Sequence, residues 1–340
     1  MIYTILVTSD CNLRCSYCYE GEKKNKQNMT IETADKVIDF IKKTFPKSES
    51  KKPHVVFHGG EPFLNFKIIK YIKTKLDNEM SNNDIIYEIT TNGTIINDEI
   101  IKFLKENNIQ LSISIDGSRD AHNKYRIFSN GKGSYDIVIK NTKYLLANNL
   151  DLRCRMTYNS DNFRDLFTGI CELKNIGLDL FATSANFYDK SWTKNSIAEL
   201  KEEIGKLMKL HKENDIHISI VDKSQICKKQ GDCFGGITSF AITPEGTIYP
   251  CIFNINSKKF AIGTVYNFNY NEIKNKMYSF HREVISLDSE CNDCGVKELC
   301  KGSKCKLLNY MVNKSYGTPP SITCELMKIE LDTYKKYTNK

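Results

Sequence analysis

Three cysteines near the start of the chain have a spacing suited to iron–sulfur chemistry. Cys11, Cys15 and Cys18 stand in the run CNLRCSYC, a C-x3-C-x2-C triplet with Tyr17 directly before the last thiol. A [4Fe–4S] cube has four irons, so three thiolates leave one iron open to a small molecule. A zinc site or a disulfide framework would more naturally bring a fourth sulfur or a histidine within reach. The other interpretation is three unrelated thiols in a loop at a strand end, and the spacing favours the cluster.

The triplet resembles the signature of the radical S-adenosylmethionine enzymes. In that family the open iron is chelated by the amino and carboxylate groups of S-adenosylmethionine. One electron then cleaves the sulfonium and releases a 5′-deoxyadenosyl radical, which takes a hydrogen atom from substrate. The resemblance implies that Cys11, Cys15 and Cys18 are the catalytic cluster ligands and that Tyr17 lies near the adenine.

Strands and helices alternate along the first two thirds of the chain. Apolar, β-branched runs predict strands at residues 2–8, 53–58, 85–91, 109–115, 151–158 and 178–184. Helical periodicity predicts helices from about Thr30, over 65–80, 97–107, 134–148 and 162–176, and around Leu200 to His211. This order predicts an α/β fold with a parallel sheet, a partial (β/α)6 barrel of the TIM type. We expect two domains, the barrel over 1–222 and a cysteine-rich domain over 223–340.

Polar and glycine residues fall at the strand ends, where parallel barrels collect their chemistry. Gly59 and Gly60 would let backbone approach a ligand, and the Glu61 carboxylate could bind an ammonium group. This run resembles the family's GGEP motif, which holds the amino group of S-adenosylmethionine. Arg126 is the expected partner of the methionine carboxylate, because a guanidinium pairs with a carboxylate through two parallel hydrogen bonds. The candidates for the ribose are Asn92 and Ser114.

Each of these motifs also has a structural interpretation. The run TTNG that contains Asn92 is as compatible with a turn as with a site. His122 is more often a residue that caps or pairs with Asp116 than one that transfers a proton. The location of several such motifs at successive strand ends, after a cluster triplet, favours a common site.

Eight further cysteines lie in the last third of the chain, enough for two sets of four. Their spacing resembles the SPASM extension of radical S-adenosylmethionine enzymes, which carries two auxiliary [4Fe–4S] clusters. The resemblance implies that the first auxiliary cluster is held by Cys227, Cys233, Cys251 and Cys305, and the second by Cys291, Cys294, Cys300 and Cys324. A helix from Cys324 to Tyr337 is expected to close the domain.

One spacing departs from the usual pattern, because four residues separate Cys300 from Cys305 where three are customary. Gly302 and Ser303 lie in that gap and are small enough to absorb the extra residue. The alternative is a zinc knuckle built from C-x2-C-x5-C-x4-C, which would leave the other four thiols of the tail without a task.

Two cysteines and three aromatic residues are left outside these assignments. Cys154 lies in a predicted strand and Cys171 in a predicted helix, and both are expected in the core. The aromatic residues of the loop after the sixth strand either line a substrate channel or pack on the barrel; they are Phe187, Tyr188 and Trp192.

Composition excludes several classes of protein. A chain of 340 residues buries a core that needs no disulfides, so its 13 cysteines indicate metal in a reducing, cytoplasmic and anaerobic setting. No apolar run approaches the roughly 20 residues of a membrane span, and the start lacks a signal peptide. The formal charge of +8 falls to roughly +3 once eleven thiolates hold three cubes. We therefore expect no membrane and no nucleic-acid partner.

The resemblance implies chemistry on a peptide. Enzymes with this auxiliary domain oxidise a cysteine or serine of sulfatases to formylglycine, or crosslink ribosomally made peptides, often through a cysteine sulfur. In the sulfatase-maturing branch an aspartate base directly follows the cysteine of the G-x4-C element. Here Ile252 follows Cys251, and isoleucine cannot accept a proton. We therefore predict a maturase of a cysteine-containing precursor peptide that forms a thioether or another crosslink.

Two alternatives stay open, a formylglycine-generating sulfatase maturase and a non-catalytic iron–sulfur electron carrier. Reductive cleavage of S-adenosylmethionine implies a flavodoxin or ferredoxin donor. Only ten residues precede Cys11, so leader recognition is expected to fall to a separate leader-binding protein or to the barrel surface. The substrate, the bond formed, the general base, the oligomeric state and the role of Cys154 are not determined by the sequence.

Overall fold

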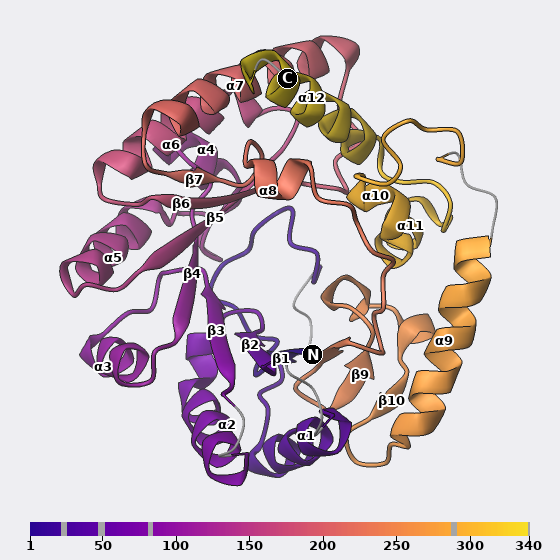
Figure 1. Cartoon of the computed structure of the whole chain (residues 1–340). Coiled ribbons are helices and arrows are strands. Elements are labelled where there is room, and N and C mark those ends of the chain that lie inside the picture. The colour runs from indigo at the N-terminus through magenta and orange to yellow at the C-terminus, as the bar shows by residue number, and fades with distance from the viewer. Residues whose placement is uncertain (22–25, 47–51, 81–83, 287–290, 339–340) are drawn as a thin grey trace. The chain divides into compact units, whose positions relative to one another are not determined.

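The computed structural model describes residues 1–21, 26–46, 52–80, 84–286 and 291–338 (Figure 1). Its first six strands are β1 Ile2–Leu6, β2 His54–His58, β3 Ile86–Thr91, β4 Gln110–Ser114, β5 Leu152–Tyr158 and β6 Leu180–Ala185. The helices that alternate with them are α1 Ile31–Thr44, α2 Phe66–Glu79, α3 Asp98–Glu106, α5 Tyr135–Ala147, α6 Leu166–Asn175 and α7 Lys194–Glu213. All twelve lie where the sequence predicts them, with ends that differ by a few residues.

The remaining elements include short helices and the strands of the cysteine-rich part. The short helices before residue 230 are η1 Pro62–Asn65, α4 Arg119–Tyr125, η2 Phe163–Asp165 and α8 Lys223–Ile226. The later elements are β7 His217–Ile218, β8 Ser239–Ile242, β9 Thr247–Tyr249, η3 Ile252–Asn254, η4 Lys258–Phe260, β10 Gly263–Thr264, α9 Tyr270–Ser286, α10 Lys301–Lys304, α11 Lys306–Asn313 and α12 Ser321–Thr338. Of these, the sequence predicts only α12.

The described strands form an open sheet. β10 and β7 are its two edge strands, so the sheet does not close on itself, as a partial barrel requires. The β1–β2, β2–β3, β5–β6 and β6–β7 pairs are parallel, while β8–β9 and β9–β10 are antiparallel. The predicted fold class is confirmed.

The chain divides into two compact units. The first contains Met1–Arg14, Cys18–Ser112 and Phe234–Ile285, and the second contains Cys15–Tyr17, Ile113–Cys233 and Ser286–Lys340. The segment Phe234–Ile285 joins the N-terminal strands because β8 pairs with β1, with Ile5 opposite Ile242. This division differs from the predicted domains 1–222 and 223–340, and that boundary stays a prediction.

An aromatic core joins β1, α1 and β8 in the first unit. The rings of Tyr3 and Phe240 stack at 5.9 Å, and Phe40 meets Phe240 edge-on at 5.2 Å. Tyr3 is fully buried, and its hydroxyl lies 2.9 Å from Oγ1 of Thr44. Buried aromatic pairs contribute about 1 kcal/mol beyond the area they remove from water. The core therefore binds the first strand of the barrel to a strand of the cysteine-rich part.

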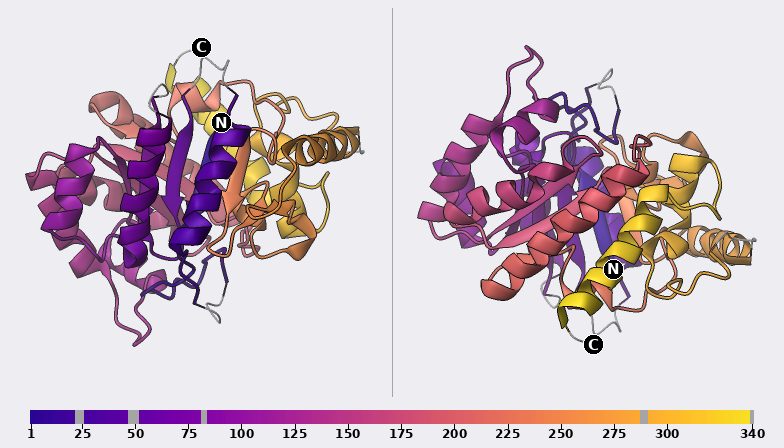
Figure 2. Two further views of the ribbon diagram at one scale, coloured as in Figure 1. Left: turned by 90° about the horizontal axis from the view of Figure 1, so that it is seen from below. Right: turned by 90° about the horizontal axis from the view of Figure 1, so that it is seen from above.

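In the second unit, α12 lies along α7, and Figure 2 shows the two helices side by side. Tyr337 of α12 packs against Gly205 of α7, where an added Cβ would lie at an ordinary contact distance of 3.4 Å from the tyrosine hydroxyl. Lys201 Nζ also lies 2.9 Å from a carboxylate oxygen of Asp332. Among the described residues, no helix combines the length and apolarity that crossing a membrane demands.

Candidate functional site

The loop after β1 carries the cysteine triplet in irregular backbone. Cys11 is only 8% exposed, and its sulfur accepts hydrogen bonds from the Leu13 backbone N–H at 3.4 Å and from Nδ2 of Asn92 at 3.7 Å. Hydrogen bonds to cysteine sulfur set the reduction potential of an iron–sulfur cluster. Cys15 and Cys18 are partly exposed. The arrangement fits a ligand loop with one enclosed and two more accessible thiols.

The paired glycines after β2 contact the backbone of this loop. Gly60 N–H donates to the Thr8 carbonyl at 2.9 Å, and Glu61 N–H donates to the Asp10 carbonyl at 2.8 Å. A Cβ would lie 2.4 Å from the Thr8 oxygen at Gly59, whose φ is +150°, and 2.1 Å from the Asp10 oxygen at Gly60. The sequence predicts that these glycines let backbone approach a ligand. In the structure the glycines instead pack against the loop that carries the cysteines.

Glu61 is enclosed rather than open to a ligand. Its side chain has no exposed surface, and it accepts from Thr91 Oγ1 at 2.7 Å and from the backbone N–H groups of Asn92 at 2.7 Å and Phe63 at 3.2 Å. Burial raises the pKa of Glu61 to about 7, and these hydrogen bonds oppose that rise. The carboxylate thus caps η1 and ties the GGEP and TTNG loops together. This geometry does not favour the ammonium contact predicted for its side chain.

The two residues predicted for the ribose have different surroundings. Asn92 is buried, and its amide donates to Oδ1 of Asn12 at 2.9 Å and accepts from the backbone N–H of Thr94 at 2.9 Å. Asn92 therefore organises the cysteine loop and its own turn, and Asn12 and Thr94 are partners that the sequence did not single out. Ser114 ends β4 and is half-buried.

Asp116 organises the residues predicted to contact S-adenosylmethionine in the second unit. It accepts from Arg126 Nε at 2.9 Å, from Arg126 Nη2 at 3.2 Å, from the Thr157 backbone N–H at 2.9 Å and from the Tyr17 hydroxyl. The Arg126 guanidinium also lies 5.4 Å from the centroid of the Tyr17 ring. Asp116 lies two residues after β4, and this position near a strand end is the signal that could have identified it.

The charge of Asp116 dominates its neighbours. Burial alone would lower the pKa of Arg126, but the adjacent carboxylate holds that pKa well above its ordinary value. Burial also raises the pKa of Tyr17 well above its ordinary value, so its hydroxyl stays protonated and donates. Arg126 donates two of its five N–H groups to Asp116, and the other three can bind a ligand carboxylate.

His122 belongs to a closed ring of hydrogen bonds. Its Nδ1 accepts from the Asp116 backbone N–H at 3.3 Å, and its Nε2 lies 2.9 Å from the Ser134 hydroxyl, which donates to the Arg126 carbonyl at 2.8 Å. Burial lowers the pKa of His122 to about 3, so its imidazole is neutral at pH 7. With both ring nitrogens engaged, the structural interpretation holds, and a proton-transfer role is not supported.

Six of the tail cysteines, all in the second unit, lie in two groups. Burial raises the pKa of Cys324 to about 11, and the thiols close enough to add to this rise are Cys300, Cys291 and Cys294. Burial raises the pKa of Cys305 to about 11 as well, and there the neighbouring thiol is Cys233. This grouping is compatible with the predicted ligand sets, and the places of Cys227 and Cys251 in the first set stay a prediction.

The grouping also bears on the zinc alternative. A zinc knuckle would gather Cys305 with Cys291, Cys294 and Cys300 around one centre. The thiol close enough to act on Cys305 is instead that of Cys233, which lies outside the knuckle motif. A cube takes each thiolate on a different iron, so its ligands stand farther apart. The donor set therefore fits a cluster better than a zinc ion.

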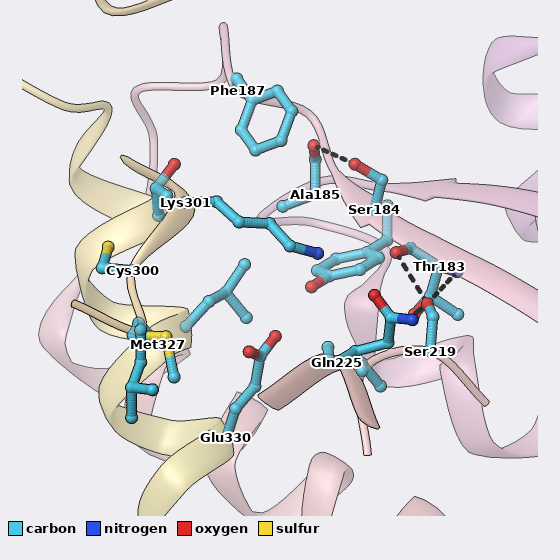
Figure 3. A pocket seen from close by; sticks show the side chains of 15 residues that line it. Thr183, Ser184, Ala185, Phe187, Ser219, Gln225, Cys300, Lys301, Met327 and Glu330 are labelled. Carbon is cyan, nitrogen blue, oxygen red and sulfur yellow. Dashed lines mark hydrogen bonds between the residues drawn. The ribbon is translucent and has the colours of Figure 1, made fainter. Parts of the chain in front are cut away.

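A cavity of about 150 Å³ lies in the second unit beside Cys300. Figure 3 shows Glu330, Lys301 and Gln225 around it, and Phe187 at one end. Burial raises the pKa of Glu330 to about 7, and Lys301 opposes the rise. Phe187 therefore lines a cavity, and its predicted place in a substrate channel stays a prediction.

Other residues of that region are structural. Trp192 packs edge-on against Tyr158 at 6.3 Å and tilted against Phe163 at 5.4 Å, so it belongs to the barrel wall. Cys154 is fully buried and donates from its sulfur to the Ile115 carbonyl at 3.6 Å. Cys171 is partly exposed, so its predicted place in the core is wrong.

Comparison with known proteins defines the class. Residues 5–166 match the model of the radical SAM superfamily, and residues 233–295 match that of the SPASM iron–sulfur cluster-binding domain. The chain belongs to the radical SAM superfamily and carries a SPASM domain, so it is an enzyme of this group. The predicted complement of S-adenosylmethionine and three [4Fe–4S] clusters agrees with that architecture.

Three relatives extend the comparison. The cysteine-type anaerobic sulfatase-maturating enzyme of Clostridium novyi is 27% identical, over 94% of this chain and 91% of that protein. The structure of anSMEcpe with bound AdoMet and Cp18Cys peptide has a TM-score of 0.80 at 19% identity, covering 99% of this chain and 97% of that one. SuiB of Streptococcus suis, bound to its precursor peptide SuiA, has a TM-score of 0.68 at 16% identity, covering 95% and 75%. At these identities the two structures establish the fold alone.

Proposed function

We propose that this enzyme abstracts a hydrogen atom from a carbon of a cysteine-containing precursor peptide and joins that carbon to a cysteine sulfur as a thioether. One observation carries the proposal: the chain combines eight tail cysteines with a cysteine-triplet loop whose backbone packs directly against the backbone of Gly59 and Gly60. An open-corner cluster beside two auxiliary clusters provides both a radical source and an electron acceptor.

The proposed ligands of the catalytic cluster are Cys11, Cys15 and Cys18. Those of the auxiliary clusters are Cys227, Cys233, Cys251 and Cys305 for the first, and Cys291, Cys294, Cys300 and Cys324 for the second. When bound, the cluster and S-adenosylmethionine supply one-electron cleavage of the sulfonium and a 5′-deoxyadenosyl radical. All eleven thiols must lose their protons to bind iron. Burial raises the pKa of two of them, Cys305 and Cys324, to about 11, so we expect cluster loading to release protons.

The chain's own residues orient the nucleotide. In the proposal Tyr17 faces the adenine, Arg126 receives the methionine carboxylate, and Ser114 and Asn92 lie toward the ribose. Asp116 fixes the tyrosine hydroxyl and the guanidinium in one network. The backbone of Gly59 and Gly60 contacts the cysteine loop, and the Glu61 side chain ties the GGEP loop to Thr91.

A thioether requires the thiol proton and one electron to leave as the carbon–sulfur bond forms. We assign the electron to an auxiliary cluster. The residue after Cys251 is Ile252, which has no group that can take the proton, so we assign the thiol proton to water. Ile252 also departs from the sulfatase-maturing pattern, and this departure is the reason formylglycine formation ranks second.

Formylglycine formation is the second candidate, because the Clostridium novyi sulfatase-maturating enzyme aligns over nearly the whole chain. Mass spectrometry after anaerobic incubation with a cysteine-containing peptide separates the two products. A thioether crosslink loses two hydrogens and keeps its sulfur, whereas formylglycine formation replaces the sulfur of a cysteine with a carbonyl oxygen. If S-adenosylmethionine is fully cleaved and the mass of the peptide does not change, both the thioether and the formylglycine reaction are contradicted for that peptide.

A non-catalytic electron carrier is the alternative of another class. Reconstituted protein should hold about twelve irons and convert S-adenosylmethionine to 5′-deoxyadenosine under strong reductant. Cys15→Ala should abolish the cleavage and keep the auxiliary clusters, which leaves about eight irons. Intact S-adenosylmethionine with the full iron content would overturn the proposal.

The proposed partners follow from this chemistry. The electron for cleavage comes from a low-potential flavodoxin or ferredoxin, and a separate leader-binding protein or the barrel surface presents the peptide. We place the enzyme in the cytoplasm, because 13 cysteines require a reducing compartment.

A further inference from the structure

Tyr19, the residue directly after Cys18, contacts the segment that begins at Cys251. Its ring meets Phe253 edge-on at a centroid distance of 5.5 Å, and its carbonyl accepts a hydrogen bond from Nδ2 of Asn256 at 2.9 Å. We refer to residues 251–256 as the auxiliary segment. All of these residues lie in the first compact unit.

Tyr19 also reaches the loop after β2. Its hydroxyl lies 3.4 Å from Nδ1 of His58, and the two rings are 6.3 Å apart. His58 directly precedes Gly59, whose backbone fits against Thr8. One side chain thus links the end of the cysteine loop, the GGEP loop and the auxiliary segment.

We propose that Tyr19 is a positioning residue through which the auxiliary segment holds the Cys18 corner of the catalytic cluster in place for S-adenosylmethionine. The inference rests on the proposed function, because it uses the cluster roles of Cys18 and Cys251. It adds a coupling between two metal sites, which the cysteine pattern by itself does not contain.

The two ends of the cysteine loop differ in how they are fixed. Backbone hydrogen bonds from Gly60 and Glu61 hold the beginning of the loop at Thr8 and Asp10. At the Cys18 end, the contacts of Tyr19 with Phe253 and Asn256 provide an anchor from outside the loop. If the Cys18 thiolate were displaced, the position of the iron that S-adenosylmethionine chelates would change, because the three thiolates position the whole cluster.

The auxiliary segment is well placed to transmit such an effect. Cys251 is the N-cap of η3, the single turn that carries Phe253, so a metal that fixes the thiol also fixes the ring. Coupling between two sites is reciprocal, since each ligand changes the affinity of the other by the same factor. Binding of S-adenosylmethionine should therefore stabilise the auxiliary segment.

The test uses the reconstituted holoenzyme with Phe253→Ala and Asn256→Ala. We expect the dissociation constant for S-adenosylmethionine, measured anaerobically by calorimetry, to rise about five- to tenfold for Phe253→Ala while about twelve irons are retained. Asn256 is exposed, so its alanine variant should fold normally and show a smaller rise in the same direction. Tyr278→Ala, an exposed aromatic of α9 in the same unit, is the matched control and should bind as wild type does.

A second readout follows the reciprocal effect. Hydrogen exchange of amides 252–256 should slow when S-adenosylmethionine is added to wild type, and this protection should be lost in Phe253→Ala. Wild-type affinity in both variants, or protection that is unchanged by Phe253→Ala, would overturn the coupling while the proposed function stands. Failure of wild type itself to bind S-adenosylmethionine would instead contradict the proposed function.

Discussion

Two regions predicted to serve S-adenosylmethionine are held together by opposite means. In the first unit, Thr8 and Asp10 meet Gly59 and Gly60 through backbone atoms that leave no room for a Cβ. In the second unit, Asp116 gathers Tyr17 and Arg126 through charge and hydrogen bonds. The first region should be sensitive to added volume and the second to lost charge. Similar motifs at neighbouring strand ends can therefore respond to different substitutions.

The largest effect is expected at Asp116. Asp116→Asn keeps the size of the side chain but leaves the buried Arg126 guanidinium without a counter-ion. We expect the free energy of unfolding, measured by anaerobic urea titration, to fall by about 4 kcal/mol. Asp136→Asn breaks an exposed pair with Arg119 and is the control, with an expected loss below about 1 kcal/mol. Equal losses in the two variants would mean that the network around Asp116 is not held by charge.

Gly60→Ala tests the steric region. The new methyl group would lie 2.1 Å from the Asp10 carbonyl oxygen, so one of the two loops must move. We expect a loss of about 3 kcal/mol in the free energy of unfolding and reduced iron at the catalytic cluster. Gly231→Ala is the matched control, because a Cβ at Gly231 meets nothing within 4 Å. Full iron content and wild-type stability in Gly60→Ala would show that the cysteine loop and the GGEP loop can move apart at little energetic cost.

Tyr17→Phe sharpens the comparison by removing one hydrogen bond and keeping the ring. Asp116 retains its bonds from Arg126 and Thr157, so the expected loss in the free energy of unfolding is about 1 kcal/mol. Combined with Asp116→Asn in a double-mutant cycle, the variant isolates the tyrosine–aspartate bond. Additive losses would show that this bond is not part of the network.

A further effect is a pH dependence that belongs to the first region. Burial raises the pKa of Glu61 from 4.5 to about 7, so the folded state binds more protons than the unfolded state between these values. The contribution of Glu61 to stability is therefore complete below about pH 4.5 and is lost as the pH rises toward 7. Glu61→Gln should flatten this decline in urea titrations at pH 5.5, 6.5 and 7.5. An unchanged slope would assign the decline to another group, such as Glu330.

Much of the barrel could be predicted from the sequence because its signals are local. Periodic apolar residues place six strands and the helices between them, and the tight spacing of Cys11, Cys15 and Cys18 indicates one ligand loop. α9 carried a comparable signal that was missed. Its buried residues Ile273, Met277 and Val284 recur at helical spacing.

The misjudged features depend on contacts between distant segments. Nothing in GGEP shows that its glycines face the backbone of Thr8 and Asp10 and not a ligand. The partners of Asp116 lie at positions 17, 126 and 157, and β8 pairs with β1 across more than half of the chain. Such pairings follow from tertiary packing, which local propensity does not encode.

The contact between α7 and α12 has a consequence for synthesis of the protein on the ribosome. Leu200, Ile204 and Leu207 of α7 are completely buried in the finished structure, yet the helix that lies along α7 begins only at Ser321. At about 5–20 residues per second, roughly 5–20 s pass between translation of the two helices. During that interval α7 lacks its final neighbour, so a stalled or prematurely ended chain should be a preferred substrate for chaperones and proteases.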